Sequence, residues 1–239
     1  MAPHLKILLL VGCAISYYIS FTPPNSTNSR NVSMQVHQNS MFDKMVLKLS
    51  IYAKMMVTIG FLCEILVNAE RIIHDASLET WSTQIICPLE TANKDYLLHL
   101  FPEFAVGAIL MLVGAALRVW CFSAMGQNFT FQVAIKPDHY LVKHGPYSYC
   151  RHPSYSGGFI QIIGLIMMHF SRGSWNQVCG IMLTKAGWAV MVYIGLAVYS
   201  FWSWIKRADF EDLILQQKFA GEWENYRRNV PYKFVPQLW

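Results

Sequence analysis

The sequence predicts an all-α integral membrane protein with about five transmembrane helices. Hydrophobic residues make up 54% of the 239-residue chain and charged residues only 14%, well below the roughly one quarter of charged residues that is usual in soluble domains. The apolar residues gather in runs that reach or approach the ~20 residues needed to cross a bilayer. The net charge of +5 is modest, and its basic residues cluster near the C-terminus, which is typical of membrane topology rather than of nucleic-acid binding.

Two predicted spans lie in the first hundred residues. Residues 5–21 form the first apolar run, and a loop rich in Pro, Asn, Ser and Thr follows over residues 22–44. Residues 45–68 form the second run, and residues 69–98 form a polar connection. We divide the chain into an N-terminal membrane region, residues 1–100, and a C-terminal core, residues 101–239.

Three further spans are predicted in that core, at residues 101–122, 155–170 and 186–205. The loop 123–153 is dense in polar and turn-forming residues, and the connector 171–185 is mixed in character. The tail 206–239 is polar and is expected to begin as a continuation of the last helix. This order predicts that the loop 123–153 and the tail emerge on the same side of the membrane.

Charged residues inside apolar runs need partners, because an isolated charge in a bilayer is costly. Lys54 and Glu64 lie in the second run, and we expect them to pair with each other or with Glu103. Arg118 lies near the end of the third run, where its long side chain is expected to extend toward the interface.

Basic residues predict the orientation. The loop 123–153 and the tail carry nine of the 19 Lys and Arg residues, so both are expected on the cytosolic side. Tracing back along the chain places the N-terminus in the lumen, which argues against cleavage of the first run as a signal peptide. The sequons at Asn25 and Asn31 are then expected to stay unglycosylated.

The six cysteines form no C-x-x-C pair, and most lie in or beside apolar runs. Neither a disulfide framework nor a zinc site is expected. Cys150 lies within the polar loop, and as a lone cysteine it is expected to be a packing residue rather than a nucleophile.

Two polar stretches carry the candidate chemistry. Residues 138–158 are dense in His, Tyr, Arg and Gly and run directly into the fourth predicted span, which suits a polar ligand held at the interface. Arg207 and Glu211 follow the last span, four residues apart and therefore on one helix face. Taken separately, the first stretch could be an interfacial anchor and the second an ordinary salt bridge.

Together, these stretches resemble the isoprenylcysteine carboxyl methyltransferases, membrane enzymes that complete the processing of prenylated CaaX proteins. The resemblance covers roughly residues 100–239. The family pattern H-x-L-V-x-x-G-x-Y-x-x-x-R-H-P-S-Y is met by His139, Leu141, Val142, Gly145, Tyr147, Arg151, His152, Pro153, Ser154 and Tyr155. A second family pattern, R-x-x-x-E followed by an aromatic-x-x-Tyr and a Val, is met by Arg207, Glu211, Trp223, Tyr226 and Val230. An upstream G-x-N-F is met by Gly126, Asn128 and Phe129.

The resemblance implies S-adenosylmethionine as cofactor, in a cytosolic pocket formed by the loop before the fourth span and the C-terminal helical tail. Its cofactor-binding residues would be Gln132, His139, Tyr140, Leu141, Val142, Tyr147, His152 and Ser154. Arg207 and Glu211 would be the catalytic, substrate-binding residues. The resemblance further implies an endoplasmic reticulum membrane protein that acts on prenylated C-terminal cysteines and contacts lipid, with no metal and no nucleic acid.

This chemistry is consistent with the residues present. A C-terminal carboxylate is already ionised at neutral pH, so methyl transfer to it requires no general base. A phospholipid N-methyltransferase is one alternative, but an amine acceptor needs its proton removed. A related membrane reductase is another, although no G-x-G-x-x-G motif follows a strand. A non-enzymatic scaffold would leave the polar loop unexplained.

Overall fold

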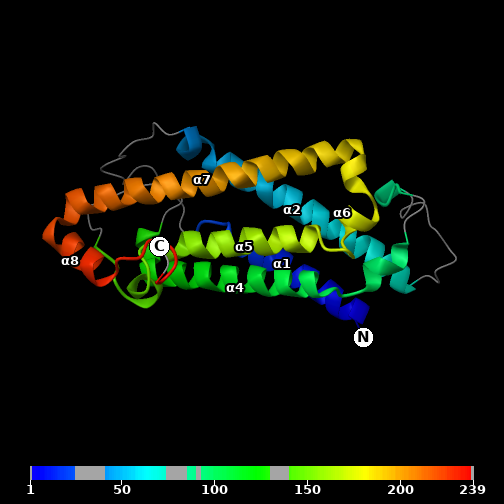
Figure 1. Cartoon of the computed structure of the whole chain (residues 1–239), viewed down its shortest axis with the longest axis horizontal. Helices are drawn as coiled ribbons and strands as arrows, with labels where there is room; N and C mark the ends of the chain where they lie inside the picture. The colour runs from blue at the N-terminus through cyan, green and yellow to red at the C-terminus, as the bar shows by residue number, and fades with distance from the viewer. Residues whose placement is uncertain (1, 25–40, 74–84, 90–92, 130–139, 238–239) are drawn as a thin grey trace. The chain divides into compact units, whose positions relative to one another are not determined.

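The computed structural model describes residues 2–24, 41–73, 85–89, 93–129 and 140–237. Helices are the only regular secondary structure among these residues. The α-helices are α1 (Ala2–Ser20), α2 (Met41–Ile73), α4 (Pro102–Met125), α5 (Pro153–His169), α6 (Trp175–Val178), α7 (Lys185–Phe219) and α8 (Gly221–Asn229) (Figure 1). Short 3-10 helices are η2 (Lys94–Leu98), η3 (Gly126–Asn128), η4 (Gly145–Ser148) and η5 (Ile181–Leu183).

The predicted fold class, an all-α membrane protein, is confirmed. Among the described residues, four helices are long and apolar enough to cross a membrane, at Pro3–Ser20, Lys48–Ile73, Lys94–Asn128 and Lys185–Phe219. The remaining predicted span corresponds to α5, whose 17 residues lie at the lower limit of a spanning helix. The last helix continues well beyond its apolar part, as predicted, because α7 has 35 residues and ends at Phe219.

Residue contacts divide the chain into two units. One comprises Met1–Tyr18, Tyr52–Val113 and Ile160–Ala197, and the other comprises Ile19–Ile51, Gly114–Phe159 and Val198–Trp239. Both draw on segments far apart in the sequence, and each long helix contributes to both units. This division by contacts does not test the predicted boundary at residue 100.

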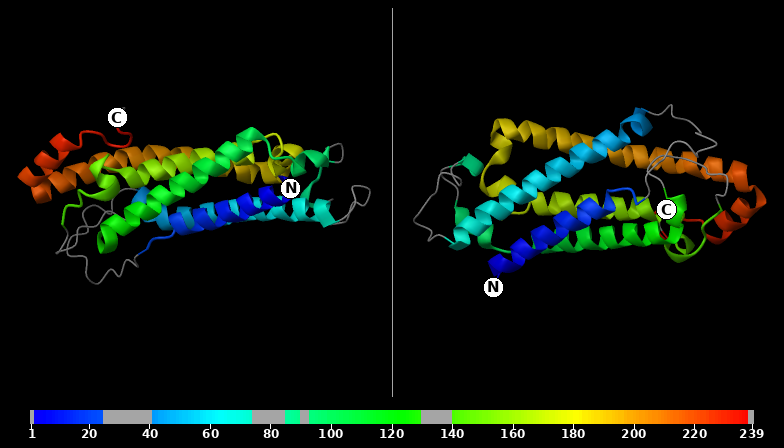
Figure 2. Two further views of the ribbon diagram at one scale, coloured as in Figure 1. Left: turned by 90° about the horizontal axis from the view of Figure 1, so that it is seen from below. Right: turned by 180° about the vertical axis from the view of Figure 1, so that it is seen from behind.

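In the first unit, α5 packs directly on α4, and the two helices run side by side in Figures 1 and 2. A Cβ atom built on Gly164 would lie 2.5 Å from the carbonyl oxygen of Gly107, so both positions need a residue without a side chain. α1 joins this group through the Cys13 thiol, which lies 3.8 Å from the Ala108 carbonyl oxygen. Small residues therefore set the distance between these helices.

A buried ion pair also belongs to the first unit, and it differs from the one predicted. Glu64 pairs with Lys6 of α1 at 3.0 Å, and both side chains are almost fully buried. The Lys6 ammonium also donates to the carbonyl oxygens of Leu97 (2.8 Å) and Gly173 (2.7 Å). The expected pairing of Glu64 with Lys54 or Glu103 is therefore wrong, because a lysine near the chain start is its partner.

Lys54 and Glu103, the two residues expected to pair with Glu64, each contact a different residue. The Lys54 ammonium lies over the ring of Tyr18, 5.0 Å from its centroid. Glu103 pairs with Arg172 at 2.8 Å, across the end of α5. Sequence spacing could not indicate either contact, since both join residues that are more than 30 positions apart.

A disulfide is present, although the spacing of the cysteines gave no reason to expect a disulfide framework. Cys87 and Cys179 are bonded, 92 residues apart in sequence. Both are buried in an apolar cluster with Val67, Leu97, Val178 and Ile181. No short spacing motif exists for this pair, because Cys87 lies in the connection after α2 and Cys179 directly follows α6.

In the second unit, Arg118 is buried rather than extended toward the interface. Its side chain donates to the carbonyl oxygens of Ser20 (2.9 Å) and Ser154 (3.0 Å). Its guanidinium also lies over the ring of Phe21, at 4.7 Å. Arg118 therefore links the end of α1 to the start of α5, and two accepting carbonyls offset the cost of burying its charge.

Candidate active site

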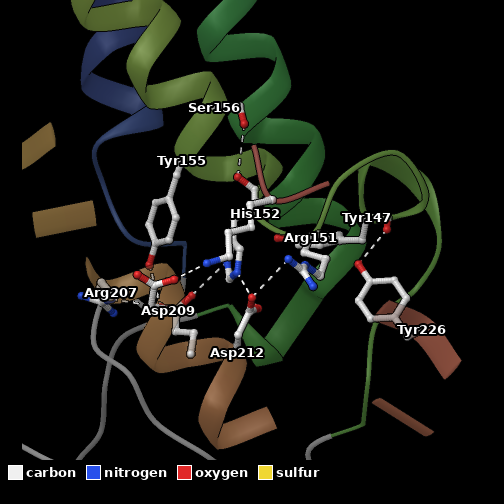
Figure 3. Close-up of polar contacts among 11 residues, drawn as sticks. Tyr147, Arg151, His152, Tyr155, Ser156, Arg207, Asp209, Asp212 and Tyr226 are labelled. Carbon is white, nitrogen blue, oxygen red and sulfur yellow. Dashed lines mark hydrogen bonds and ion pairs between the residues drawn. The ribbon is translucent and has the colours of Figure 1, made fainter. Parts of the chain in front are cut away.

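The candidate site lies in the second unit, where the polar part of α7 faces the segment just before α5 (Figure 3). Gly145 has φ +62, a backbone conformation that glycine adopts without strain, and it opens the short helix η4. Pro153 then begins α5, a position that proline favours because its missing N–H is not needed there. These two turns place Arg151 and His152 against α7.

The C-terminal segment after α8 holds the backbone of these two residues. The Arg151 N–H donates to the Tyr232 carbonyl oxygen (3.0 Å), and the His152 N–H donates to that of Lys233 (2.8 Å). The side chain of His152 is thereby directed at α7.

Two side-chain hydrogen bonds attach α8 and the segment after it to the residues around His152. The Ser156 hydroxyl donates to the Phe234 carbonyl oxygen at 2.6 Å. The Tyr226 hydroxyl donates to the Tyr147 carbonyl oxygen at 2.8 Å (Figure 3). Both bonds are buried, where each contributes on the order of 1 kcal/mol. The tail is therefore an integral part of the site.

Glu211 is the centre of the polar network. Its Oε1 accepts from the Arg207 Nε at 3.0 Å and from the Tyr155 hydroxyl at 2.6 Å. Its Oε2 lies 3.4 Å from the His152 Nδ1. The predicted pairing of Arg207 and Glu211 on one helix face is therefore present, with two further partners from the start of α5.

Asp212 is the second carboxylate of the network. Its Oδ1 lies 2.8 Å from the His152 Nε2, and its Oδ2 lies 3.5 Å from the Arg151 Nη2. The His152 ring therefore lies between two carboxylates of adjacent residues, one at each ring nitrogen (Figure 3).

The electrostatics of this cluster favour a protonated imidazole. Burial lowers the pKa of His152, but its hydrogen bonds to Asp212 and Glu211 and their negative charges outweigh that effect, so the pKa is raised. With His152 protonated, the cations Arg151, His152 and Arg207 face the carboxylates Glu211 and Asp212. The cluster then carries one excess positive charge and is suited to an anionic ligand.

Two of the predicted cofactor residues, Gln132 and His139, lie outside the described residues. Tyr140 is more than half exposed. Leu141 and Val142 are buried in two apolar clusters, the first with Trp223, Tyr226 and Val230 and the second with Cys121 and Tyr147. Within the described part of the chain, no backbone–backbone hydrogen bond is found for residues 140–142.

The remaining predicted cofactor residues lie between that segment and α5. Tyr147 and Ser154 are buried, and burial raises the pKa of Tyr147 well above its usual value, which keeps its hydroxyl neutral. His152 is engaged with the two carboxylates. The structure brings His152 together with Glu211 and, through Glu211, with Arg207.

Nucleophilic catalysis by the nearby cysteine is disfavoured. Cys150 is buried, and burial raises the pKa of its thiol to about 11, so the reactive thiolate is scarce at neutral pH. In the part of the chain that the structure describes, no group of three His, Cys, Asp or Glu side chains could hold a metal ion.

Three residues of the charged network, Arg151, Tyr155 and Asp212, were not assigned a role from the sequence. Tyr155 closes the first motif, but its bond to Glu211 depends on the packing of α5 against α7. Asp212 follows Glu211 directly, and adjacent helix positions do not normally face the same partner. The imidazole of His152 is placed so that it reaches both carboxylates, which no spacing rule would indicate.

Comparison with known proteins agrees with this picture. The pattern of the isoprenylcysteine carboxyl methyltransferase (ICMT) family matches residues 107–195. A rice (Oryza sativa subsp. indica) "probable protein-S-isoprenylcysteine O-methyltransferase" is 29% identical over 160 residues, which are 62% of this chain and 74% of the rice protein. No solved structure matches the chain significantly.

Two longer relatives are similar over a smaller share of their length. The protein-S-isoprenylcysteine O-methyltransferase of Dictyostelium discoideum is 31% identical over 135 residues, 56% of this chain and 49% of that protein. The enzyme of that name from Rattus norvegicus is 33% identical over 129 residues, 53% of this chain and 39% of that protein. The resemblance noted in the sequence is thus confirmed for residues 107–195, which match the isoprenylcysteine carboxyl methyltransferase family.

Proposed function

We propose that this chain transfers a methyl group from S-adenosylmethionine to the C-terminal carboxylate of prenylcysteine in CaaX-processed proteins. The family is one of methyltransferases, and the relatives are named for prenylcysteine esterification. The observation that carries the proposal is the buried cluster around Arg207, whose excess positive charge matches a carboxylate acceptor. The catalytic core is proposed to be residues 101–239.

Arg207 is proposed to bind and orient the acceptor. Its guanidinium can hold a carboxylate in a bidentate arrangement, while its Nε remains on Glu211. The acceptor is ionised before it binds, so the site has to position it rather than deprotonate it. Glu211 fixes Arg207 and limits how strongly the arginine withdraws charge from the attacking oxygen.

The methyl donor is proposed to lie against the segment 139–154. S-adenosylmethionine supplies an activated methyl group on a sulfonium. The peptide groups of Leu141 and Val142 make no backbone–backbone hydrogen bond within the described chain and suit hydrogen bonding to an adenine, and Tyr140 and Tyr147 offer aromatic rings. Gln132, His139, His152 and Ser154 complete the proposed set.

The proposed acceptor carries its own membrane anchor. Each buried CH₂ of a prenyl chain contributes about 0.8 kcal/mol to binding, so the lipid would favour entry from the bilayer. We propose that the protein lies in the endoplasmic reticulum membrane with its site facing the cytosol. The Cys87–Cys179 disulfide supports this orientation, because both connections that carry it are expected in the oxidising lumen.

The direct test is to incubate membranes containing the protein with radiolabelled S-adenosylmethionine and N-acetyl-S-farnesyl-cysteine. We expect a base-labile methyl ester. Arg207→Ala should remove most of the product while S-adenosylmethionine binding survives. Lys206→Ala is the matched control, because Lys206 is exposed and lies over the Trp202 ring, away from Glu211.

The outcomes separate the assignments. If the wild-type protein forms no methyl ester but transfers the label to a phospholipid amine, the acceptor is that amine and not a prenylcysteine carboxylate. Loss of donor binding in Arg207→Ala, with acceptor capture intact, would reverse the role given to Arg207.

A further inference from the structure

We infer that Asp212 is a positioning residue. By binding the Nε2 of His152, it directs the Nδ1 of the same ring at Glu211, and this contact keeps Glu211 aligned with Arg207. This inference rests on the proposed function, since it concerns how the site orients a carboxylate acceptor. It starts from geometry, because the His152 Nε2 lies 2.8 Å from Asp212 and the Nδ1 lies 3.4 Å from Glu211.

Asp212 lies closer to the His152 ring than Glu211 does. A separation of 2.8 Å is that of a strong charge-assisted hydrogen bond, whereas 3.4 Å is long for one. The other carboxylate oxygen of Asp212 faces Arg151 at 3.5 Å, which orients the group toward the ring. The contacts of Asp212 within the described chain run to His152 and Arg151, so it acts on Glu211 through His152.

The ring has little freedom to turn elsewhere. Its side chain is 5% exposed, and its backbone N–H is bound to Lys233. The ring stacks on Tyr155, with centroids 5.7 Å apart, and lies 6.0 Å from the ring of Phe234. The two carboxylates therefore meet the edges of a ring whose faces are already covered.

Protonation decides whether the ring can serve both carboxylates. An imidazolium carries a hydrogen on each nitrogen, whereas a neutral imidazole carries only one. If His152 is neutral and donates to Asp212, the lone pair of its Nδ1 faces an oxygen of Glu211 and repels it. The other charged or titratable groups that interact with the two carboxylates are Arg151 and Tyr226 at Asp212, and Arg207, Tyr155 and Tyr147 at Glu211.

The consequence falls on Glu211. Its Oε1 already accepts from Arg207 and Tyr155, so only Oε2 remains for His152. When that contact becomes repulsive, the carboxylate turns and takes the Arg207 guanidinium with it. Methyl transfer should then fail on the alkaline side of the pH profile, through poor acceptor alignment.

The variant that isolates this effect is Asp212→Asn, measured on the full-length protein in detergent between pH 6 and 9. The amide keeps an oxygen that can accept from His152 but removes the charge that favours imidazolium. We expect the alkaline limb of the kcat profile to move about one pH unit lower, which is about a tenfold loss on that limb. Asp212→Glu should keep the wild-type limb, because the charge is retained.

Asp209→Asn is the matched control. Asp209 lies on the same helix, is about half exposed, and pairs with Lys233 rather than with the ring. It should leave the profile unchanged. An unchanged limb in Asp212→Asn, or an equal shift in both asparagine variants, would overturn the inference.

Histidine NMR separates this inference from the proposed function. With histidine-labelled protein, the His152 signal is identified by its loss in His152→Gln, and its pKa should fall in Asp212→Asn but not in Asp209→Asn. If wild-type protein forms no methyl ester, the proposed function fails while the NMR titration still tests the coupling. If ester forms and the His152 pKa does not move in Asp212→Asn, the inference alone fails.

Discussion

At the residue scale, the site depends on how the two oxygens of one carboxylate are shared. Glu211 gives one oxygen to Arg207 and Tyr155 and the other to His152. Each bond to an ionised partner contributes about 1.5–3 kcal/mol, more than a neutral hydrogen bond. Removing one donor therefore changes the direction of the carboxylate as well as its binding energy.

The stability of the protein should depend on pH through His152. The pKa of this residue is raised in the folded state, whereas in the unfolded chain it is about 6.5. Its contribution is therefore fully present below about pH 6.5 and is lost as the pH rises through the folded pKa. We expect the Tm in detergent to fall as the pH is raised above 6.5.

The comparison that assigns this effect is His152→Gln. Glutamine cannot titrate, so the variant should have a lower Tm at pH 6.5 and a flatter dependence above it. A variant that retains the full wild-type slope would show that another group causes the pH dependence.

Local spacing accounts for what could be predicted among these residues. Arg207 and Glu211 are four apart on a helix, and that geometry alone predicts their contact. The bonds of Glu211 to His152 and Tyr155 join residues more than 50 positions apart. They depend on how α5 and α7 pack, which the sequence pattern does not specify.

At the element scale, α5 is short and closely packed. A Cβ on Gly164 would meet the Gly107 oxygen at 2.5 Å and the Met111 nitrogen at 2.7 Å, and neither backbone atom can move cheaply. We expect Gly164→Ala to destabilise the protein by about 1–3 kcal/mol, the range for overpacking a core, as measured by thermal unfolding in detergent.

Gly195 provides the matched control within a helix. Nothing lies within 4 Å of a Cβ built there, so Gly195→Ala adds no clash. It should be neutral or stabilising by up to about 1 kcal/mol, because alanine favours a helix over glycine. Equal effects at the two positions would contradict close packing at Gly164.

The helices themselves were the most predictable elements. A long apolar run in a bilayer must form a helix to satisfy its backbone, so each predicted span appears as one. The buried Lys6–Glu64 pair could not be predicted in the same way, since hydropathy treats each charge separately. The polar end of α7 was predicted to be helical, but its contacts were not.

At the scale of the whole molecule, the disulfide and the order of the spans bear on the same question. The five spans expected from the sequence would place the connection after α2 and the connector around α6 on one side of the membrane. Cys87 and Cys179 lie in those two segments and are bonded to each other. A disulfide persists in the lumen but is reduced in the cytosol, so the expected topology and the bond agree.

Counting reactive thiols in the denatured protein tests this agreement. Cys13, Cys63, Cys121 and Cys150 are free, so a polyethylene-glycol maleimide should add to these thiols without reductant, and to two more after reduction. Changing both Cys87 and Cys179 to Ser should abolish the difference, whereas Cys63→Ser should keep it. If all six thiols react before reduction in protein prepared from intact membranes, the segments that carry Cys87 and Cys179 lie in a reducing compartment. The sequons at Asn25 and Asn31, which lie outside the described residues, should then be glycosylated, and the active site would face away from its methyl donor.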